Sequence, residues 1–149
     1  AGMNFHLSGV DEKARNWSGL NLSGVDFRGA HLRKVQFEES QLYGANLQDA
    51  DLSGAKLQGA NLDEAKLQGT NLGEAKLQGA NLGEANLQGA NLMVADLQGA
   101  HLFRAKMQNA NLRGCDLSWW QLKQVKDSGL TGSQITEDDF ADKFYPFAL

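Results

Sequence analysis

The sequence predicts an all-β solenoid, a chain wound into stacked coils, and the regularities of a five-residue unit lead to that prediction. A large apolar residue recurs at every fifth position from Leu22 to Leu122, 21 times in all: 18 Leu, two Phe and one Met. Two residues earlier lies a small position, which from residue 45 to residue 110 is Ala except at Thr70. The polar position between them is always Asn, Asp, Gln, Lys or His. The two residues after the centre, the first and second corner positions, are mostly Gln, Gly, Glu, Ser or Arg.

A five-residue period fits neither a helix nor a long strand. In a helix each central residue would lie roughly 140° around the axis from the last, so no apolar stripe would form. In a strand the small and central positions share a face, but the next centre is an odd number of residues away and would point to the opposite face. The pattern therefore requires a turn between successive units, and Gly at the corner positions suits such a turn because it tolerates positive φ.

Repeated corners of one hand wind the chain into coils, which pair their backbones as the strands of a sheet do. Units alternate in kind, KLQGA before NLGEA, so an even number of units per coil stacks like on like. Four units per coil would place two sets of glutamines on opposite sides, where they would form ladders: Gln48, Gln68, Gln88 and Gln108, and Gln58, Gln78 and Gln98.

The unit A-[D/N]-L-x-x, as in Ala60-Asn61-Leu62 and Ala90-Asn91-Leu92, closely resembles the repeat of the pentapeptide-repeat proteins. The resemblance is dense over residues 20–126. It implies a right-handed quadrilateral parallel β-helix with four units per coil. It also implies a bacterial and especially cyanobacterial type of protein, many of whose members have no assigned activity. We expect residues 1–19 to form an N-terminal cap or degenerate repeats, and residues 127–149 to hold shifted repeats, a capping helix and an acidic aromatic tail.

The C-terminal units depart from the pattern. Cys115 replaces Ala at a small position, and Trp120 follows at the next one, where we expect it to point inward. We predict a short capping helix near 137–145, because Thr136 suits an N-cap and Pro146 stops a helix. The aromatic tail either folds back as a cap or docks onto a second copy, and we favour a capped monomer over a dimer through the C-terminal end.

Composition restricts the protein's environment and partners. The net charge is −4, yet residues 20–126 hold 11 acidic and 11 basic side chains, and the excess lies in residues 127–149, which hold five acidic residues and one Lys. No apolar run approaches the length of a membrane span, so we expect no contact with membrane. No signal peptide is visible. We therefore expect a cytoplasmic protein, the alternative being a processed mature form in another compartment.

Candidate chemistry is sparse. The three histidines, His6, His31 and His101, are far apart in the coil register and do not predict a metal site. Cys115 is read as a core substitute for Ala rather than a nucleophile. No phosphate-binding Gly loop is present. We expect neither an enzyme nor a cofactor.

The positions also predict which side chains lie inside and which face a partner. Examples of the buried core are Leu62, Leu82, Leu102, Ala80 and Ala100. Four apolar residues occupy outward corner positions and are candidate partner contacts: Met93, Val94, Phe103 and Tyr43. Met93 and Val94 share one side of the predicted coil, whereas Phe103 and Tyr43 share the opposite side.

Two functions follow as hypotheses. The first is a non-catalytic structural or protein-interaction module whose partner is another protein. The alternative, implied by the family resemblance, is a DNA-mimicking binder of DNA gyrase or topoisomerase. Mimicry needs a strongly negative surface, and the repeat region is neutral with only two Phe centres. Direct nucleic-acid binding lacks a basic patch with stacking aromatics, so we expect none.

Overall fold

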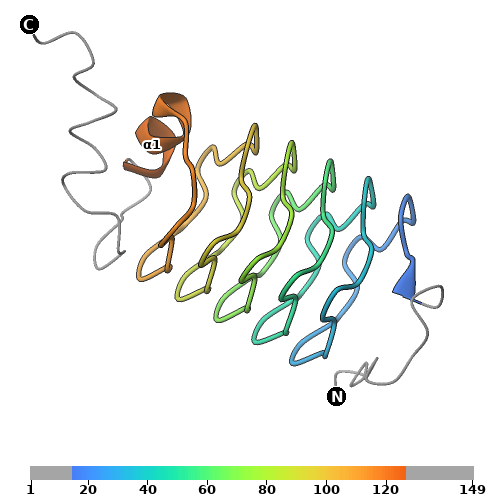
Figure 1. Cartoon of the computed structure of the whole chain (residues 1–149). Coiled ribbons are helices and arrows are strands. Elements are labelled where there is room, and N and C mark those ends of the chain that lie inside the picture. Colours follow the sequence, from blue (N-terminus) through green and yellow to red (C-terminus); the bar gives the residue numbers. More distant parts are fainter. Residues whose placement is uncertain (1–14, 127–149) are drawn as a thin grey trace, which may run out of the picture.

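Residues 15–126 are described by the computed structural model, in which they form a rod of stacked coils closed at one end by a helix (Figure 1). Sixteen isolated parallel β-bridges join polar positions 20 residues apart, from Asn16–Gln36 to Asn91–Asn111. Twenty residues are four units, so each coil holds four units, as predicted. We number the four sides of the coil by their first centres: side 1 from Trp17, side 2 from Leu22, side 3 from Phe27 and side 4 from Leu32.

The core is a column of small and central side chains that point into the coils. Leu62, Leu82, Leu102 and Ala80 are fully buried, and Ala100 is 4% exposed. Thr70, the exception among the small positions, is also buried, and its hydroxyl donates a 2.7 Å hydrogen bond to the carbonyl of Leu47. Ala and Leu therefore alternate inside each coil, which packs the interior without leaving a polar group unpaired at Thr70.

The interior of the first two coils is aromatic on side 1 and side 3 instead. The ring centroid of Trp17 lies 5.7 Å from that of Phe27 and 5.5 Å from that of Phe37. Phe27 and Phe37 are fully buried, while Trp17 is half-buried. These large side chains close the N-terminal end of the described rod with apolar surface that Leu alone would not supply.

The corners confirm the predicted need for positive φ, and they assign it to the second corner position. Eleven glycines and nine other residues have positive φ, and all of them occupy that position. Examples are Gly79 at 66° and Glu84 at 51°. The N–H after each corner bonds to the carbonyl of the preceding centre, as in Ala85 to Leu82 at 3.2 Å. Positive φ at the third turn residue is the geometry of a type II turn.

In the unit 80–84, in the middle of the rod, every backbone N–H has a hydrogen-bond partner. Ala80 donates to the turn carbonyl of Leu77 at 3.0 Å, and Asn81 donates back to Ala60 at 2.9 Å. Leu82 and Glu84 donate forward to residues 101 and 103. The remaining donor, Gly83, bonds to the side-chain oxygen of Asn81 at 3.0 Å. Asn or Asp at the polar position thus completes the backbone pairing, which explains its recurrence.

Ladders of side chains join the coils, but they are made mainly by asparagine rather than glutamine. On side 4 each side-chain amide donates to the side-chain oxygen one coil earlier. The distances are 3.2 Å from Asn111 to Asn91, 3.1 Å from Asn91 to Asn71 and 3.3 Å from Asn71 to Asp51. Gln88 donates to Gln108 at 3.0 Å on side 3. The predicted glutamine columns are in register, yet the side-chain oxygens of three of their members are buried without a hydrogen bond: Gln58, Gln68 and Gln78.

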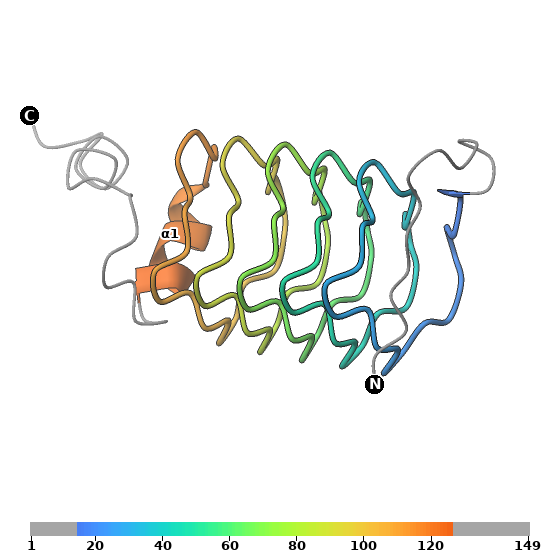
Figure 2. The same cartoon turned by 90° about the horizontal axis from the view of Figure 1, so that it is seen from below.

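The C-terminal end differs from the expectation. Helix α1 (Trp119–Lys126) lies across the last coil (Figure 2), inside the range 20–126 that the sequence assigns to repeats. Trp120 was expected to point inward and is instead 58% exposed, because α1 turns it away from the core. Ser118 and Gln121 form a capping box: Gln121 N–H bonds Ser118 Oγ, and Ser118 N–H bonds Gln121 Oε1. The helix predicted near 137–145 lies outside the described residues.

Candidate interaction surfaces

The corner formed by Met93 and Val94 on side 4 is the most unusual exposed apolar site in the repeats. Met93 is 46% and Val94 56% exposed. In the next coil the equivalent second corner residue is Gly114, where a Cβ would lie 3.3 Å from Val94 Cγ2, so no side chain covers Val94. The corner residue one coil earlier is Glu74, a charged residue. Two adjacent apolar side chains therefore interrupt an otherwise polar edge.

The backbone of Val94 is strained. Its φ is 61°, in the left-handed region that β-branched residues rarely adopt. The left-handed conformation costs an L-residue about 1 to 2 kcal/mol. Gly occupies the same position in eleven other units at no such cost. Eight other residues without Gly's freedom share this φ, but all of them are polar, and Val94 alone is apolar and β-branched. An exposed Val in this conformation is thus explained by neither the core nor the turn.

Side 2 carries the other two predicted partner contacts, Tyr43 and Phe103, which occupy the same column three coils apart. They are 43% and 60% exposed. Asp63 and Gly83 lie between them in the column, so Tyr43 and Phe103 do not form one continuous apolar patch. A Cβ at Gly83 would lie 2.7 Å from Asp63 Oδ1, so a larger residue there would have to displace the Asp63 carboxylate.

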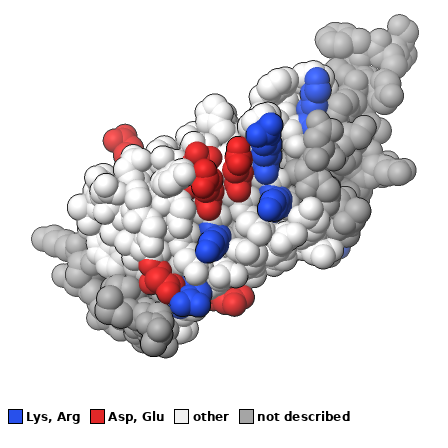
Figure 3. Space-filling view, turned by 180° about the vertical axis from the view of Figure 1, so that it is seen from behind, with Lys and Arg blue, Asp and Glu red and all other residues white. Residues whose placement is uncertain are grey.

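Charged groups surround this column. The pKa of Tyr43 is raised, mainly because its hydroxyl hydrogen-bonds the Glu64 carboxylate. The pKa of Asp63 is also raised, first by burial and then by the negative charges of Glu64 and Glu84. Arg104 balances part of this charge, with its Nη1 3.6 Å from Glu84 Oε1. Figure 3 shows one face of the rod, on which acidic and basic side chains lie close together and much of the surface is uncharged.

A third surface, which the sequence reasoning missed, is the outward face of α1. Trp119 and Trp120 are 47% and 58% exposed, with ring centroids 6.4 Å apart. The ammonium of Lys123 lies 5.6 Å from the first ring and 5.8 Å from the second. The sequence Ser118-Trp-Trp-Gln121 is a capping-box pattern, and that signal predicts a helix with both tryptophans in its first turn.

The inward face of α1 closes the last coil. The side-chain amide of Gln121 donates to the carbonyls of Leu97 and Ala100, and the side-chain oxygen of Gln124 accepts from the N–H of Leu102 at 3.0 Å. Leu122 and Val125 are buried on the same face. The helix therefore uses glutamine side chains where another coil would use its backbone, and this arrangement protects the sheet edge on side 2.

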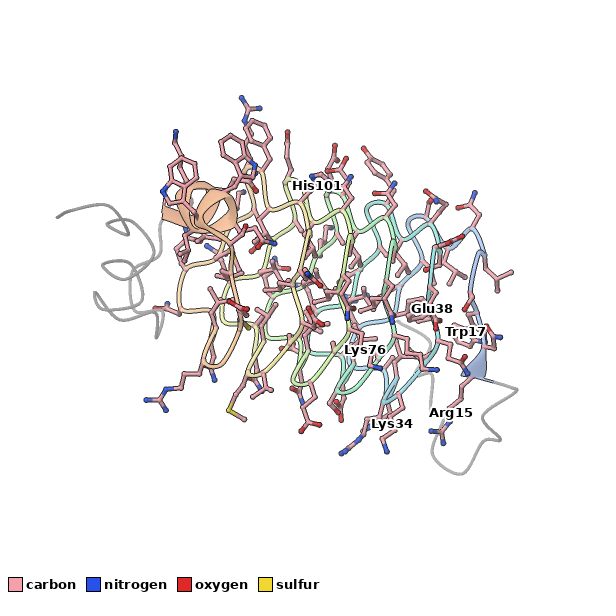
Figure 4. The ribbon with its side chains drawn as sticks, turned by 45° about the horizontal axis from the view of Figure 1, so that its top comes forward. Arg15, Trp17, Lys34, Glu38, Lys76 and His101 are labelled. Carbon is pink, nitrogen blue, oxygen red and sulfur yellow. The ribbon has the colours of Figure 1, made fainter. Side chains whose placement is uncertain are left out.

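The candidate reactive residues do not converge. His31 and His101 lie on sides 4 and 2, and His101 points out from the rod near α1, far from Trp17 at the other end (Figure 4). Within residues 15–126 no group of three or more His, Cys, Asp or Glu side chains is arranged to hold a metal ion. His6 lies outside the described residues.

Cys115 is a partly buried substitute for Ala, as predicted. Its Sγ donates to the Leu92 carbonyl at 3.0 Å, and burial raises the pKa of the thiol to about 11. A thiol with such a pKa is a poor nucleophile near neutral pH. Among the described residues no helix is long and apolar enough to cross a membrane.

Comparison with protein families identifies the same five-residue repeat that the sequence pattern indicates. The sequence model of the family described as pentapeptide repeats matches residues 21–59, 55–92 and 82–118, with 8 copies. The comparison with curated proteins gave no match. The matched repeats and the coil register confirm the predicted right-handed quadrilateral parallel β-helix with a short C-terminal helix.

Solved structures of repeat proteins are similar to this chain. A pentapeptide repeat protein from the thylakoid lumen of Arabidopsis thaliana is 25% identical, with 83% of this chain and 88% of that chain covered and a TM-score of 0.45. Rfr23 from the cyanobacterium Cyanothece 51142 is 35% identical over 71% of this chain and 82% of its own, with a TM-score of 0.35. QnrB1, a plasmid-mediated fluoroquinolone resistance protein, is 16% identical over 89% of this chain and 68% of its own, with a TM-score of 0.43.

Proposed function

The chain belongs to the pentapeptide-repeat family, and on that premise we propose that it is a non-catalytic protein-interaction module that binds a partner protein through the Met93–Val94 corner. The observation that carries the proposal is Val94, a β-branched residue that is 56% exposed and held at a φ of 61°. Folding alone would favour Gly at this position. An apolar side chain kept in a strained, solvent-exposed conformation is suited to burial against another molecule.

The form of the rod supports a binding role over a catalytic one. Its interior is filled by buried side chains such as Leu62 and Leu82. Its polar side chains point outward and form hydrogen bonds with the corners and between coils. Asn81, for example, bonds Gly83 N–H and the side chain of Asn61. Catalysis requires a nucleophile or base that converges with its partners on one substrate. A long rod with repeating flat sides instead offers extended surfaces for a protein.

Charge argues against the alternative of a DNA mimic. Residues 15–126 hold 12 basic and 11 acidic side chains, so the rod lacks the negative charge of a duplex, which carries one charge per about 1.7 Å. We expect no protection of DNA gyrase by this chain in a supercoiling assay with ciprofloxacin. Protection that depends on the chain's concentration would instead favour the mimic.

The test is affinity capture from an extract of the source cell, with a variant that separates binding from folding. Val94→Gly removes the exposed side chain and relieves the strain, so it should raise stability by about 1 kcal/mol. Glu74→Gly is the matched control, because it changes the same corner position one coil earlier, where φ is 58°. Chemical unfolding measures the stability of both variants.

We expect a partner protein to be captured by the parent chain and by the Glu74→Gly control. The same protein should not be captured by Val94→Gly or by Met93→Ser. Equal retention by all four chains would remove the corner as the contact. A reproducible turnover that co-purifies with the chain and is lost with it would contradict a non-catalytic role.

A further inference from the structure

The outward face of α1 and the adjoining corner on side 2 form a surface that joins aromatic rings with cations. We call it the basic aromatic end and define it by Phe103, Arg104, Trp120 and Lys123. Arg104 lies over the ring of Phe103 at 5.1 Å, and Lys123 lies over Trp120 at 5.8 Å. The helix and the corner on side 2 are joined by the hydrogen bond that Gln124, next to Lys123, accepts from the N–H of Leu102, next to Phe103.

The cations of this end are only partly neutralised by the rod. Arg104 has a single carboxylate near it, 3.6 Å away on Glu84, and both side chains are more than half exposed. Among residues 15–126 Lys123 forms no ion pair, and its ammonium lies over the two tryptophan rings. Phe103 and Trp120 are each about three-fifths exposed, at 60% and 58%. The surface therefore fits a partner that brings both carboxylates and apolar side chains.

Charge is segregated along the chain in a way that supplies such a partner. Residues 97–126 hold five basic side chains and one acidic side chain, a net charge of +4. Residues 127–149 hold five acidic side chains and one Lys, a net charge of −4. The same segment carries aromatic residues beside its acids: Phe140, Phe144, Tyr145 and Phe147. The excess positive charge of residues 97–126 and the excess negative charge of residues 127–149 are thus equal, and the two stretches are adjacent in sequence.

We propose that residues 127–149 bind the basic aromatic end of their own chain, with carboxylates at Lys123 and Arg104 and an aromatic side chain against Trp120. The segment has 23 residues and follows directly from Lys126. Trp120 lies six residues before that point, only about 9 Å along the helix axis. A short tether gives an effective concentration near millimolar, which favours binding within the chain over binding between chains.

Binding of this segment would occupy the basic aromatic end. A competing acidic protein, or the same segment of a second copy, would have to displace it first. The inference does not depend on the proposed function, because it concerns the end of the rod and leaves the Met93–Val94 corner uncovered. The two proposals can therefore fail separately.

The test uses the full chain with Trp17→Phe, which leaves Trp119 and Trp120 as the only tryptophans. Acrylamide quenching of their fluorescence then reports how accessible the outward face of α1 is. The test variant adds Glu137→Gln, Asp138→Asn and Asp139→Asn. The control instead adds Glu39→Gln, Asp49→Asn and Glu74→Gln, three neutralisations at exposed corner positions of the rod. Circular dichroism checks that all three chains are folded alike.

We expect the quenching constant to be about twofold higher in the test variant than in the parent and unchanged in the control, because only the test variant loses charge that faces the basic aromatic end. The parent should also become more accessible in about 1 M salt, where charges are screened within about 3 Å. Equal quenching in all three chains would overturn the proposal.

A second measurement separates the chain's own segment from that of a second copy and does not need the Trp17 substitution. A carbodiimide cross-links Lys123 to any carboxylate in contact, and mass spectrometry locates the link. A link from Lys123 to residues 127–149 of the same chain, in a monomer whose mass is constant from about 1 to 100 µM, supports the proposal. Links only between chains, together with a mass that doubles with concentration, would overturn binding within the chain. Absence of any link from Lys123 to this segment would overturn it as well.

Discussion

Two units of nearly the same pattern, Ala80-Asn81-Leu82 in the middle of the rod and Trp120-Gln121-Leu122 at its end, fold differently. The first is a corner-to-corner segment of a coil, whereas the second lies within α1. The central Leu is buried in both, with 0% exposure of Leu82 and 2% of Leu122. The small position distinguishes them, since Ala80 is buried and Trp120 is 58% exposed. The buried small positions of the coils hold residues no larger than Val35, because an indole there would have to displace packed side chains.

The polar position changes its role with the backbone. In the coil Asn81 faces out and accepts from Gly83 N–H at 3.0 Å. In the helix Gln121 is turned inward, is only 2% exposed and donates to the carbonyls of Leu97 and Ala100. The same polar residue class thus completes a corner in the middle of the rod and caps the backbone at its end. The helix stops the repeat without leaving those carbonyls unpaired.

The largest expected effect comes from emptying a central position. Leu82→Ala should lower the free energy of unfolding by about 2 to 5 kcal/mol, because the fully buried site cannot collapse around the smaller side chain. Chemical denaturation followed by circular dichroism measures the loss. A loss of less than about 0.5 kcal/mol, the range of a surface substitution, would contradict the inward orientation of the centre.

Filling a small position tests the distinction between the two units directly. Ala80→Leu should cost about 1 to 3 kcal/mol, because extra carbons at a fully buried site force neighbouring side chains out of place. The same denaturation experiment gives the cost. An unchanged midpoint would mean that the small position tolerates bulk, and Trp120 would then need another reason for leaving the coil.

Removing the glutamine that caps the last coil tests the end of the rod. Gln121→Ala should cost about 1 to 3 kcal/mol, because the Ala100 carbonyl loses its donor and the Leu97 carbonyl keeps only the turn hydrogen bond from Ala100 N–H. Lys123→Ala, on the outward face of α1, is the matched control and should cost less. If the two substitutions have the same effect on the unfolding midpoint, Gln121 does not cap the coil.

The smallest effect is expected at Trp120. Trp120→Ser removes an exposed ring whose contact with Lys123 is worth about 0.5 to 1 kcal/mol. The free energy of unfolding should therefore fall by no more than that amount. A loss comparable to that of Leu82→Ala would place Trp120 in the core and contradict its exposure.

Most of the fold is predictable from the repeat alone, because the residue types within each five-residue unit indicate which positions point inward and which point outward. The burial of Leu82 and Ala80 and the spacing of 20 residues between bridges follow from that pattern. The role of Asn81 as a hydrogen-bond acceptor is also predictable from sequence, because Asn side chains commonly bond the backbone N–H two residues later, here that of Gly83. The prediction that Trp120 points inward was wrong, because the Ser118–Gln121 capping box starts a helix at this unit.

The candidate surfaces could be predicted only in part. The outward positions of Met93, Val94, Tyr43 and Phe103 follow from the register. The strain at Val94 depends on φ, which the sequence pattern does not assign to one residue of the corner. The contact of Lys123 with two tryptophan rings depends on α1, whose helical spacing brings together residues that a coil would separate. Whether the exposed residues contact a partner remains a prediction.

The coil register underlies every assignment of side and surface, and engineered disulfides test it most directly. In a Cys115→Ala background, the pair Asn61→Cys and Asn81→Cys replaces two residues that form a β-bridge across adjacent coils. Adjacent strands lie about 4.8 Å apart, within the Cα separation of a disulfide. The pair Asn61→Cys and Asn71→Cys, ten residues apart, would lie on opposite sides. Under mild oxidation the first pair should cross-link within the chain and the second should not. Cross-linking of the second pair and not the first would contradict four units per coil.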